Sequence, residues 1–218
     1  MKGLTLNTKN IFNYVSRMDS IKEYSLIGGT ALSLQINHRL SEDLDFCKWK
    51  LSKFDKPTIN ISFIEKELND IGTIYKKNIL DFNQVDFIIN DVKVSFYANQ
   101  LYKSPIKNHI LLKNNLKVAD IESIGIMKLE LILRRRTFKD YYDLYSILKE
   151  GVLLKNLIEG AVKYSNYNLK SKNILLFISN GSNYIKEKKF TKLSPKYDVD
   201  EKIIESFLKN AIIKEFSQ

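Results

Sequence analysis

The sequence predicts an α+β fold, in which a small mixed β-sheet with flanking helices is followed by a helical C-terminal half. Strand-like segments at residues 24–27 and 43–49 enclose a helical stretch, and a pair of strands follows them. Beyond residue 120, apolar residues recur at the spacing of α-helices. A length of 218 residues suits one large domain or two small ones, and we expect domains at residues 1–104 and 105–218.

The first half is expected to mix helices and strands. Residues 8–19 form an amphipathic helix, because apolar side chains from Ile11 to Met18 share one face. A hairpin is expected around Asn90-Asp91, since these are favourable turn residues between two apolar strands. The remaining elements, in order, are a strand at 24–27, a helix at 30–37, a strand at 43–49, a helix (or a strand running into a helix) at about 59–70, and hairpin strands at 82–89 and 92–97.

The second half is expected to be helical. It follows a linker near Ser104-Pro105, and Gly151 is a favourable residue for ending a helix. The expected helices lie at about 121–135, 139–149, 153–165, 170–187 and 199–216.

Two aspartates give the sequence its clearest chemical signal. If Asp43-Leu44-Asp45-Phe46 is a strand, Asp43 and Asp45 project from one face while Leu44 and Phe46 project into a core. Two neighbouring carboxylates repel each other, and a divalent cation relieves that repulsion. The segment therefore predicts a metal site for Mg²⁺ or Mn²⁺; the structural alternative is a solvated strand edge.

A glycine pair precedes this strand. Gly28 and Gly29 stand between an apolar strand and a helix that begins near Thr30. Glycine permits positive φ and close approach of a ligand, and a helix N-terminus favours anions. Alone the pair indicates only a turn, but beside two aspartates it predicts a site for a metal-bound phosphate.

The spacing of these motifs resembles that of the DNA polymerase β-like nucleotidyltransferase superfamily. Within it, residues 28–32 and 38–46 are similar to AbiEii/AbiGii-type toxin nucleotidyltransferases. A second similar block comprises residues 120–129, with a lysine on a helix, and residues 135–145, which contain Lys-Asp-Tyr-Tyr-Asp-Leu-Tyr. The resemblance spans roughly residues 20–150.

The resemblance implies a nucleotidyltransferase core at 1–104 and a helical region at 105–218 that completes the active site and binds the acceptor. It implies Mg²⁺-dependent transfer of NMP from an NTP to RNA, with the tRNA 3′ end as acceptor, by a toxin paired with an antitoxin. The implied catalytic residues are Asp43, Asp45, Lys128 and Asp143, with the two former as metal ligands. The implied nucleotide-binding residues are Gly28, Gly29, Thr30, Arg39 and Lys128.

One position departs from the superfamily pattern. Ser95 stands where a neighbouring strand usually supplies a third carboxylate. In a two-residue hairpin Asp86 would lie opposite Ser95 and could approach the site instead. The structural alternative for Asp86 is a solvated residue on an edge strand.

The second block also has a chemical interpretation from its residues alone. Lys128 lies in a largely apolar helix, where it either reaches the surface along its stem or neutralises an anion. Asp140 and Asp143 share one face of the next helix. Asp140 is a further site candidate, or else an N-cap that pairs with Arg136.

A formal net charge of +10 favours a polyanionic partner. Basic residues gather at 103–117, at Arg134, Arg135, Arg136 and Lys139, and at 170–196. Aromatic residues between them suit RNA stacking, although core packing is the alternative: Tyr164, Tyr167, Phe177, Tyr184, Phe190 and Tyr197.

The composition excludes several classes of protein. The single cysteine, Cys47, excludes internal disulfides and a cysteine-based zinc site, and we expect it in the core. No apolar leader or membrane-spanning segment is apparent, which predicts a cytoplasmic location. Two other functions remain open: a nucleotidyltransferase acting on a small molecule, and a catalytically inactive module that binds RNA or protein.

Overall fold

A computed structural model describes residues 2–101 and 103–216. The chain divides into two compact units, Met1–Asp120 and Ile121–Gln218. The sequence placed the boundary at residue 104; the strands that follow that residue, β6 (His109–Lys113) and β7 (Leu116–Ala119), belong to the sheet of the first unit.

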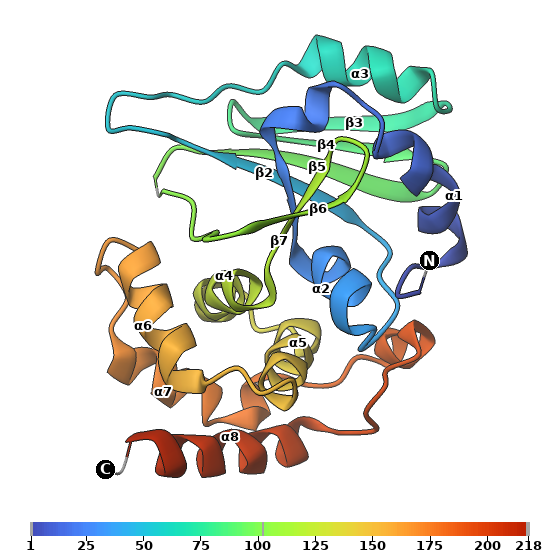
Figure 1. The fold of residues 1–218 in the computed structure, drawn as a ribbon. Coiled ribbons are helices and arrows are strands. Elements are labelled where there is room, and N and C mark those ends of the chain that lie inside the picture. Colours follow the sequence, from blue (N-terminus) through green and yellow to red (C-terminus); the bar gives the residue numbers. More distant parts are fainter. Residues whose placement is uncertain (1, 102, 217–218) are drawn as a thin grey trace. The chain divides into compact units, whose positions relative to one another are not determined.

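The first unit is built on a mixed sheet that has seven strands within residues 2–101 and 103–120, in the order β3-β4-β5-β2-β1-β7-β6. Strand β1 (Ser25–Ile27) is antiparallel to β2 and parallel to β7, and β2 (Leu44–Trp49) is parallel to β5 (Val92–Asn99). Helices α2 and α3 lie on opposite faces of this sheet (Figure 1). The remaining elements of the unit are α1 (Leu6–Val15), a 3₁₀ turn at Ser20–Glu23, α2 (Gly28–Ile36), α3 (Ile61–Asn69), β3 (Ile74–Asp81) and β4 (Gln84–Ile89).

Alternation along the strands fixes the core of this unit. Leu44 and Phe46 of β2 are fully buried, and the Phe46 ring stacks on Phe96 of β5 with their centroids 5.2 Å apart. Phe87 of β4 packs edge-on against Phe96. Asp45 therefore lies on the opposite face of β2, as the alternation predicts, together with the buried Cys47 and Trp49.

The hairpin between β4 and β5 confirms the predicted turn. Asn90 and Asp91 have φ values of 49° and 62°, and the type I′ turn of a two-residue hairpin requires such values. Strand β3, which the sequence did not predict, pairs with the outer side of β4. The interpretation of Asp86 as a residue of an edge strand is therefore wrong, because β4 is an inner strand.

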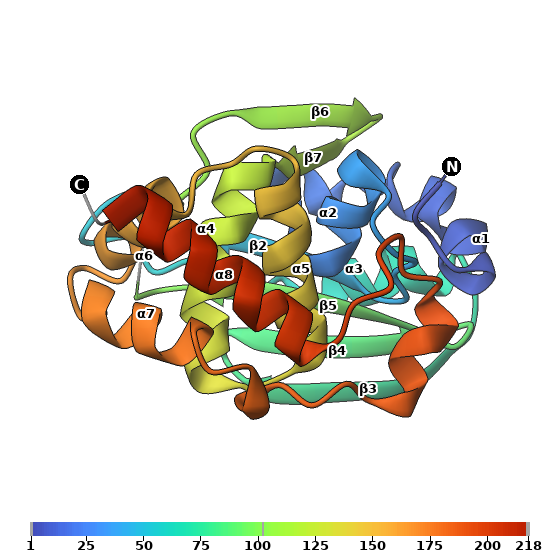
Figure 2. The same cartoon turned by 90° about the horizontal axis from the view of Figure 1, so that it is seen from below.

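The second unit is helical within its described residues, 121–216. Helix α4 packs against α5 and α6, and α8 packs across α5 and α6 (Figure 2). Predicted helix 170–187 ends early, where Gly181 donates its backbone N–H to Glu205 at 2.7 Å. The elements are α4 (Ile121–Arg134), α5 (Phe138–Lys149), α6 (Leu154–Tyr164), α7 (Ser171–Ile178), α8 (Glu201–Phe216) and 3₁₀ turns at Gly181–Asn183 and Lys188–Leu193.

Aromatic rings form much of the core of this unit. Tyr184 stacks on Tyr141 with centroids 4.2 Å apart, and Phe190 packs edge-on against Phe138 at 4.8 Å. Both Tyr184 and Phe190 are buried. These two rings therefore follow the core-packing alternative, and because they are buried in the helical unit they are not available to stack on RNA bases.

Over residues 2–101 and 103–216, no helix combines the length and the apolar composition that a membrane crossing requires.

Candidate active site

Asp45 lies at the start of β2, and Asp43 lies immediately before that strand. Both side chains are partly exposed, whereas Leu44 is fully buried behind them. Within the described ranges, no three His, Cys, Asp or Glu side chains gather closely enough to hold a metal ion. Asp43 and Asp45 remain the predicted pair of ligands, and two carboxylates suit Mg²⁺ held partly by substrate oxygens.

Gly28 places the backbone against one of these carboxylates. Ile27 of β1 is paired with Asp45, so the chain leaves β1 directly beside that side chain. Gly28 has a φ of +71°, and a β-carbon there would lie 2.9 Å from Asp45 Oδ2. The close approach and the left-handed conformation both require glycine. The space beside Asp45 thus exists because residue 28 is a glycine. Helix α2 begins at Gly28 rather than at Thr30.

Gly29 leaves space for the guanidinium group of Arg39. A β-carbon on Gly29 would collide with Arg39 Nη2 and lie 3.3 Å from Ser41 Oγ. The guanidinium of Arg39 also donates from Nη1 to the carbonyl oxygen of Leu40 at 2.9 Å. Arg39 therefore sits against the first turn of α2, where a helix N-terminus already favours an anion.

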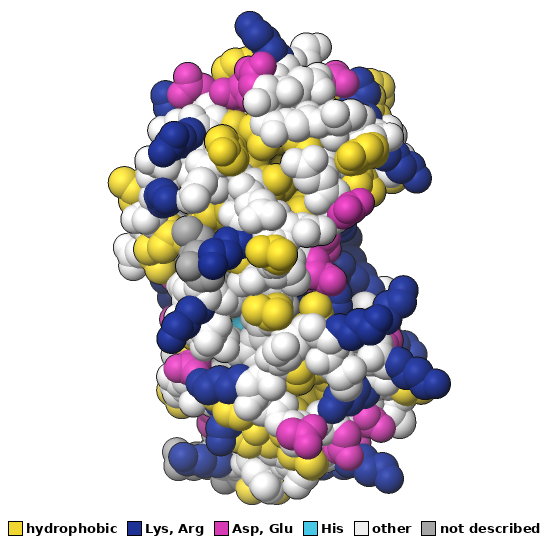
Figure 3. All heavy atoms as spheres, turned by 90° about the vertical axis from the view of Figure 1, so that its right-hand side faces the viewer, with side chains coloured by type: hydrophobic (Ala, Val, Ile, Leu, Met, Phe, Trp, Pro, Cys, Tyr) yellow, Lys and Arg dark blue, Asp and Glu magenta, His cyan; other side chains and the backbone are white. Residues whose placement is uncertain are grey.

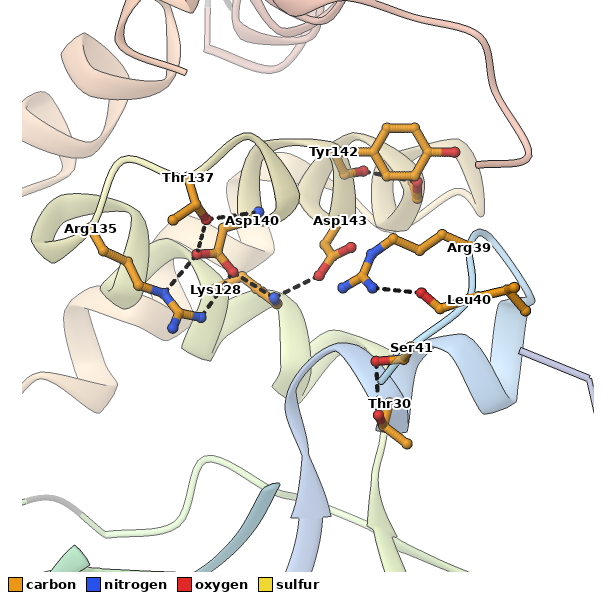
Figure 4. A network of polar contacts seen from close by, with 11 residues as sticks. Thr30, Arg39, Leu40, Ser41, Lys128, Arg135, Thr137, Asp140, Tyr142 and Asp143 are labelled. Atoms are coloured by element: carbon orange, nitrogen blue, oxygen red, sulfur yellow. Dashed lines mark hydrogen bonds and ion pairs between the residues drawn. The ribbon is translucent and has the colours of Figure 1, made fainter. Parts of the chain in front are cut away.

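The side chain of Thr30 serves the protein rather than a ligand. It is buried, and its hydroxyl contacts Ser41 Oγ at 2.8 Å (Figure 4). The same hydroxyl donates to the backbone carbonyl oxygen of Asp43. This contact joins the first turn of α2 to the residue that carries the first carboxylate. What Thr30 has to offer a phosphate is its backbone N–H.

Asp45, Ser95 and Asp86 form a row across three strands. Ser95 of β5 is paired with Asp45 on one side and with Asp86 on the other, which confirms the predicted register of the hairpin. Ser95 is fully buried, and its hydroxyl has no hydrogen-bond partner among the described residues. At the position where the family resemblance predicts a third carboxylate, this chain therefore has a serine hydroxyl without a hydrogen-bond partner among the described residues, on the same face as Asp45.

Sequence reasoning missed Lys93 on this face. Its Nζ lies 3.8 Å from Asp43 Oδ2, and both side chains remain partly exposed. The signal was present in the sequence, because alternation along the predicted strand at 92–97 puts Lys93 on the same face as Ser95.

In the second unit, Lys128 of α4 lies between two carboxylates of α5. Its Nζ is 2.6 Å from both Asp140 Oδ1 and Asp143 Oδ2, and all three side chains are buried (Figure 4). The interpretation that Lys128 reaches the surface is therefore wrong, since counter-charges within the unit offset the cost of burial.

Asp140 has further partners. Arg135 donates from Nε to Asp140 Oδ2 at 2.8 Å, and the Thr137 hydroxyl donates to the same oxygen at 2.7 Å. Burial by itself raises the pKa of Asp140, but the charges of Lys128 and Arg135 and their hydrogen bonds outweigh it, so the pKa is lowered. The N-cap of α5 is Thr137 and the pairing arginine is Arg135. The predicted N-cap role of Asp140 and its pairing with Arg136 are therefore wrong.

The side chains of the basic residues at the end of α4 and just after it contact other residues of the protein. Arg134 pairs with Glu130, and the Arg136 guanidinium lies over the Phe177 ring, 5.1 Å from its centroid. On the face shown in Figure 3, Lys and Arg side chains are spread among Asp and Glu rather than gathered in one patch. The arginines remain exposed, so an RNA phosphate would compete with these contacts.

Cys47 is a core residue, as predicted. It is buried two positions after Asp45, and burial raises the pKa of its thiol. A protonated thiol is a poor metal ligand.

The mixed sheet, the paired aspartates and the glycine turn place this chain among the nucleotidyltransferases. The family model described as nucleotidyl transferase AbiEii toxin, type IV toxin–antitoxin system, matches residues 15–215. The chain therefore belongs to the AbiEii family of toxin nucleotidyltransferases, which confirms the resemblance seen in the sequence.

Three individual proteins that resemble this chain are at most 30% identical to it. An uncharacterised protein of Aquifex aeolicus is 30% identical over 172 residues, which cover 78% of this chain and 79% of that protein. A candidate nucleotidyltransferase of H. pylori superposes with a TM-score of 0.48 at 17% identity, covering 94% of this chain and 96% of the other. The nucleotidyltransferase toxin MenT4 of Mycobacterium tuberculosis gives 0.48 at 13% identity, covering 96% and 99%.

Proposed function

We propose that this nucleotidyltransferase uses Mg²⁺ to transfer NMP from an NTP to RNA, with the 3′ end of tRNA as acceptor. The observation that carries the proposal is the position of Asp45 in β2 directly beside Gly28, with Asp43 immediately before the strand. In the cytoplasm such a modification would block aminoacylation, which suits a toxin that is paired with an antitoxin.

The donor set of the first unit fits a metal-bound triphosphate. Asp43 and Asp45 would hold Mg²⁺, and Gly28 leaves space beside Asp45 that a side chain would fill. When bound, Mg²⁺ neutralises phosphate charge and orients the reacting phosphate. The backbone N–H groups of Gly29 and Thr30 and the guanidinium of Arg39 would bind the outer phosphates.

The chemistry is an in-line displacement. The acceptor hydroxyl forms a bond to the α-phosphorus, the bond from that phosphorus to the bridging oxygen breaks, and pyrophosphate leaves. We assign the hydroxyl proton to Asp143 and contact with the triphosphate to Lys128, as the family resemblance implies. Because these two side chains pair at 2.6 Å, both roles require that contact to loosen.

Three further candidate residues have smaller roles in this proposal. Asp140 is held by Lys128 and Arg135, so it positions Lys128 rather than contacting a ligand. Asp86 and Ser95 share the face of Asp45, but β5 separates Asp86 from Asp45, so we assign Asp86 no place in the metal site.

The proposal of an RNA acceptor rests on charge. The net charge of +10 favours a polyanion, and Arg134, Arg136 and Lys139 are the residues that we assign to RNA, with Arg135 shared between RNA and Asp140. We expect RNA affinity to fall steeply with salt. Arg134→Ala and Arg136→Ala should weaken it without disturbing Asp140.

The test is incubation with each α-labelled NTP, Mg²⁺ and total tRNA. Label should appear on tRNA and fall by more than about a hundredfold in Asp43→Asn and Asp45→Asn, because each removes a metal ligand. Asp70→Asn, an exposed aspartate at the end of α3, is the matched control and should label normally.

Other outcomes select the other functions. Label on a small hydroxyl compound but not on any RNA would favour a small-molecule nucleotidyltransferase. Salt-sensitive RNA binding by folded protein, without Mg²⁺-dependent labelling of any acceptor, would favour an inactive binding module.

A further inference from the structure

Strand β5 presents a cation to the face that carries the two aspartates. Leu44 is paired with Val94 in the parallel ladder of β2 and β5, so the residues before them, Asp43 and Lys93, are neighbours. Lys93 Nζ lies 3.8 Å from Asp43 Oδ2. Both side chains are partly exposed, at 38% and 43%, so this ion pair is weak and easily exchanged for another.

The other residue that β5 contributes here is neutral. Ser95 shares the face of Lys93, is paired with Asp45, and holds a buried hydroxyl with no hydrogen-bond partner in the described part of the chain. A buried polar group without a partner is costly, which points to a ligand atom that would satisfy it. The local formal charge is thus two carboxylates and one ammonium, instead of three carboxylates.

Asp86 lies too far from Asp45 for its carboxylate to bind the same metal ion as Asp43 and Asp45. It is separated from Asp45 by β5, and adjacent strands are about 4.8 Å apart, so the two backbones are roughly 10 Å apart. Carboxylate oxygens on one Mg²⁺ lie only about 2.1 Å from it. Side chains that rise from one sheet face run side by side and do not converge over that span.

From this arrangement we infer that the site holds one divalent ion and that Lys93 takes the place of a second. The inference rests on the proposed function and assigns a new nucleotide-binding residue. With a divalent ion held by Asp43, the Lys93 ammonium would exchange this ion pair for a contact with a phosphate oxygen of the NTP. A point charge on a flexible stem is suited to that exchange.

Counting bound ions tests the inference without any turnover. Native mass spectrometry of the chain with Mn²⁺ and the α,β-methylene analogue of each NTP should show one Mn²⁺ per chain. Lys93→Asp supplies a third carboxylate and should show two. Lys93→Met should keep one ion but weaken analogue binding by roughly tenfold or more, as expected for loss of a charge-assisted hydrogen bond.

Lys22→Met is the matched control, because Lys22 is an exposed lysine paired with Asp19 at 2.7 Å in the same unit. It should bind one Mn²⁺ and the analogue as the unaltered chain does. Two ions in the unaltered chain would overturn the inference but leave the proposed function standing, and their reduction to one in Asp86→Asn would identify Asp86 as the third carboxylate. Absence of bound Mn²⁺ in folded protein would overturn the metal site and the inference together.

Discussion

Gly28 lies against the carboxylate of Asp45, so closely that a β-carbon on the glycine would be 2.9 Å from Asp45 Oδ2. The antiparallel pairing of Ile27 with Asp45 enforces this approach. The glycine turn and the paired aspartates, separated by sixteen residues of sequence between Gly28 and Asp45, are therefore parts of one site.

Gly28→Ala should weaken Mn²⁺ binding about tenfold, because the new methyl group displaces Asp45. It should also cost about 1–2 kcal/mol of stability, because an L-residue is strained at positive φ. Gly151→Ala separates the two effects: Gly151 has a φ of +90°, and a methyl group added there would meet no atom within 4 Å. Equal Mn²⁺ affinity in both variants, measured by electron paramagnetic resonance, would contradict the role of Gly28.

Thr30→Val should lower stability by about 1–3 kcal/mol, because it keeps the shape but removes the hydroxyl bonded to Ser41 and the Asp43 carbonyl oxygen. Since the hydroxyl positions Asp43, Mn²⁺ affinity should fall as well. Thr30→Ser should recover both properties in urea unfolding and metal titration. If Thr30→Val binds Mn²⁺ normally, the contact is structural only.

Lys128→Met should destabilise the chain by about 3–5 kcal/mol, because it leaves Asp140 and Asp143 buried without their shared counter-charge. The exposed pair of Lys209 with Glu205 is the comparison, and Lys209→Met should cost less than about 1 kcal/mol. Urea unfolding measures both. The double variant with Asp143→Asn should recover part of the loss; equal costs for the two lysines would refute the ion-pair account.

Acid should weaken the helical unit through Asp140. Its folded pKa lies below the ordinary value of 3.8, so below that value the unfolded chain binds more protons than the folded one. The stabilisation is complete above pH 3.8 and is lost as pH falls through the lowered folded pKa. Urea midpoints of Asp140→Asn should therefore depend less on pH in this range than those of the unaltered chain. The exposed Asp70→Asn should change the pH profile little, and a larger change there would contradict the assignment.

Features that depend on local spacing could be predicted from the sequence. The face shared by Asp43 and Asp45 follows from the two-residue period of side chains along a strand. The hairpin follows from the preference of Asn90 and Asp91 for the positive φ values of a tight turn, which is a local property of the chain. Helix α4 likewise follows from apolar periodicity. The unpredicted strands β3 and β6 are mostly exposed edge strands, so they lack the buried alternation by which strands are recognised.

The sequence by itself determined the chemical groups: two aspartates on one strand face, a glycine pair before a helix, and a lysine in an apolar helix. Only the tertiary structure decided their partners. It placed Lys93 beside Asp43 and paired Lys128 with Asp140 and Asp143. It also made Arg135, rather than Arg136, the arginine that pairs with Asp140. The reason is physical, because side-chain periodicity is set within a few residues of chain, whereas strand register and helix packing depend on contacts between distant segments.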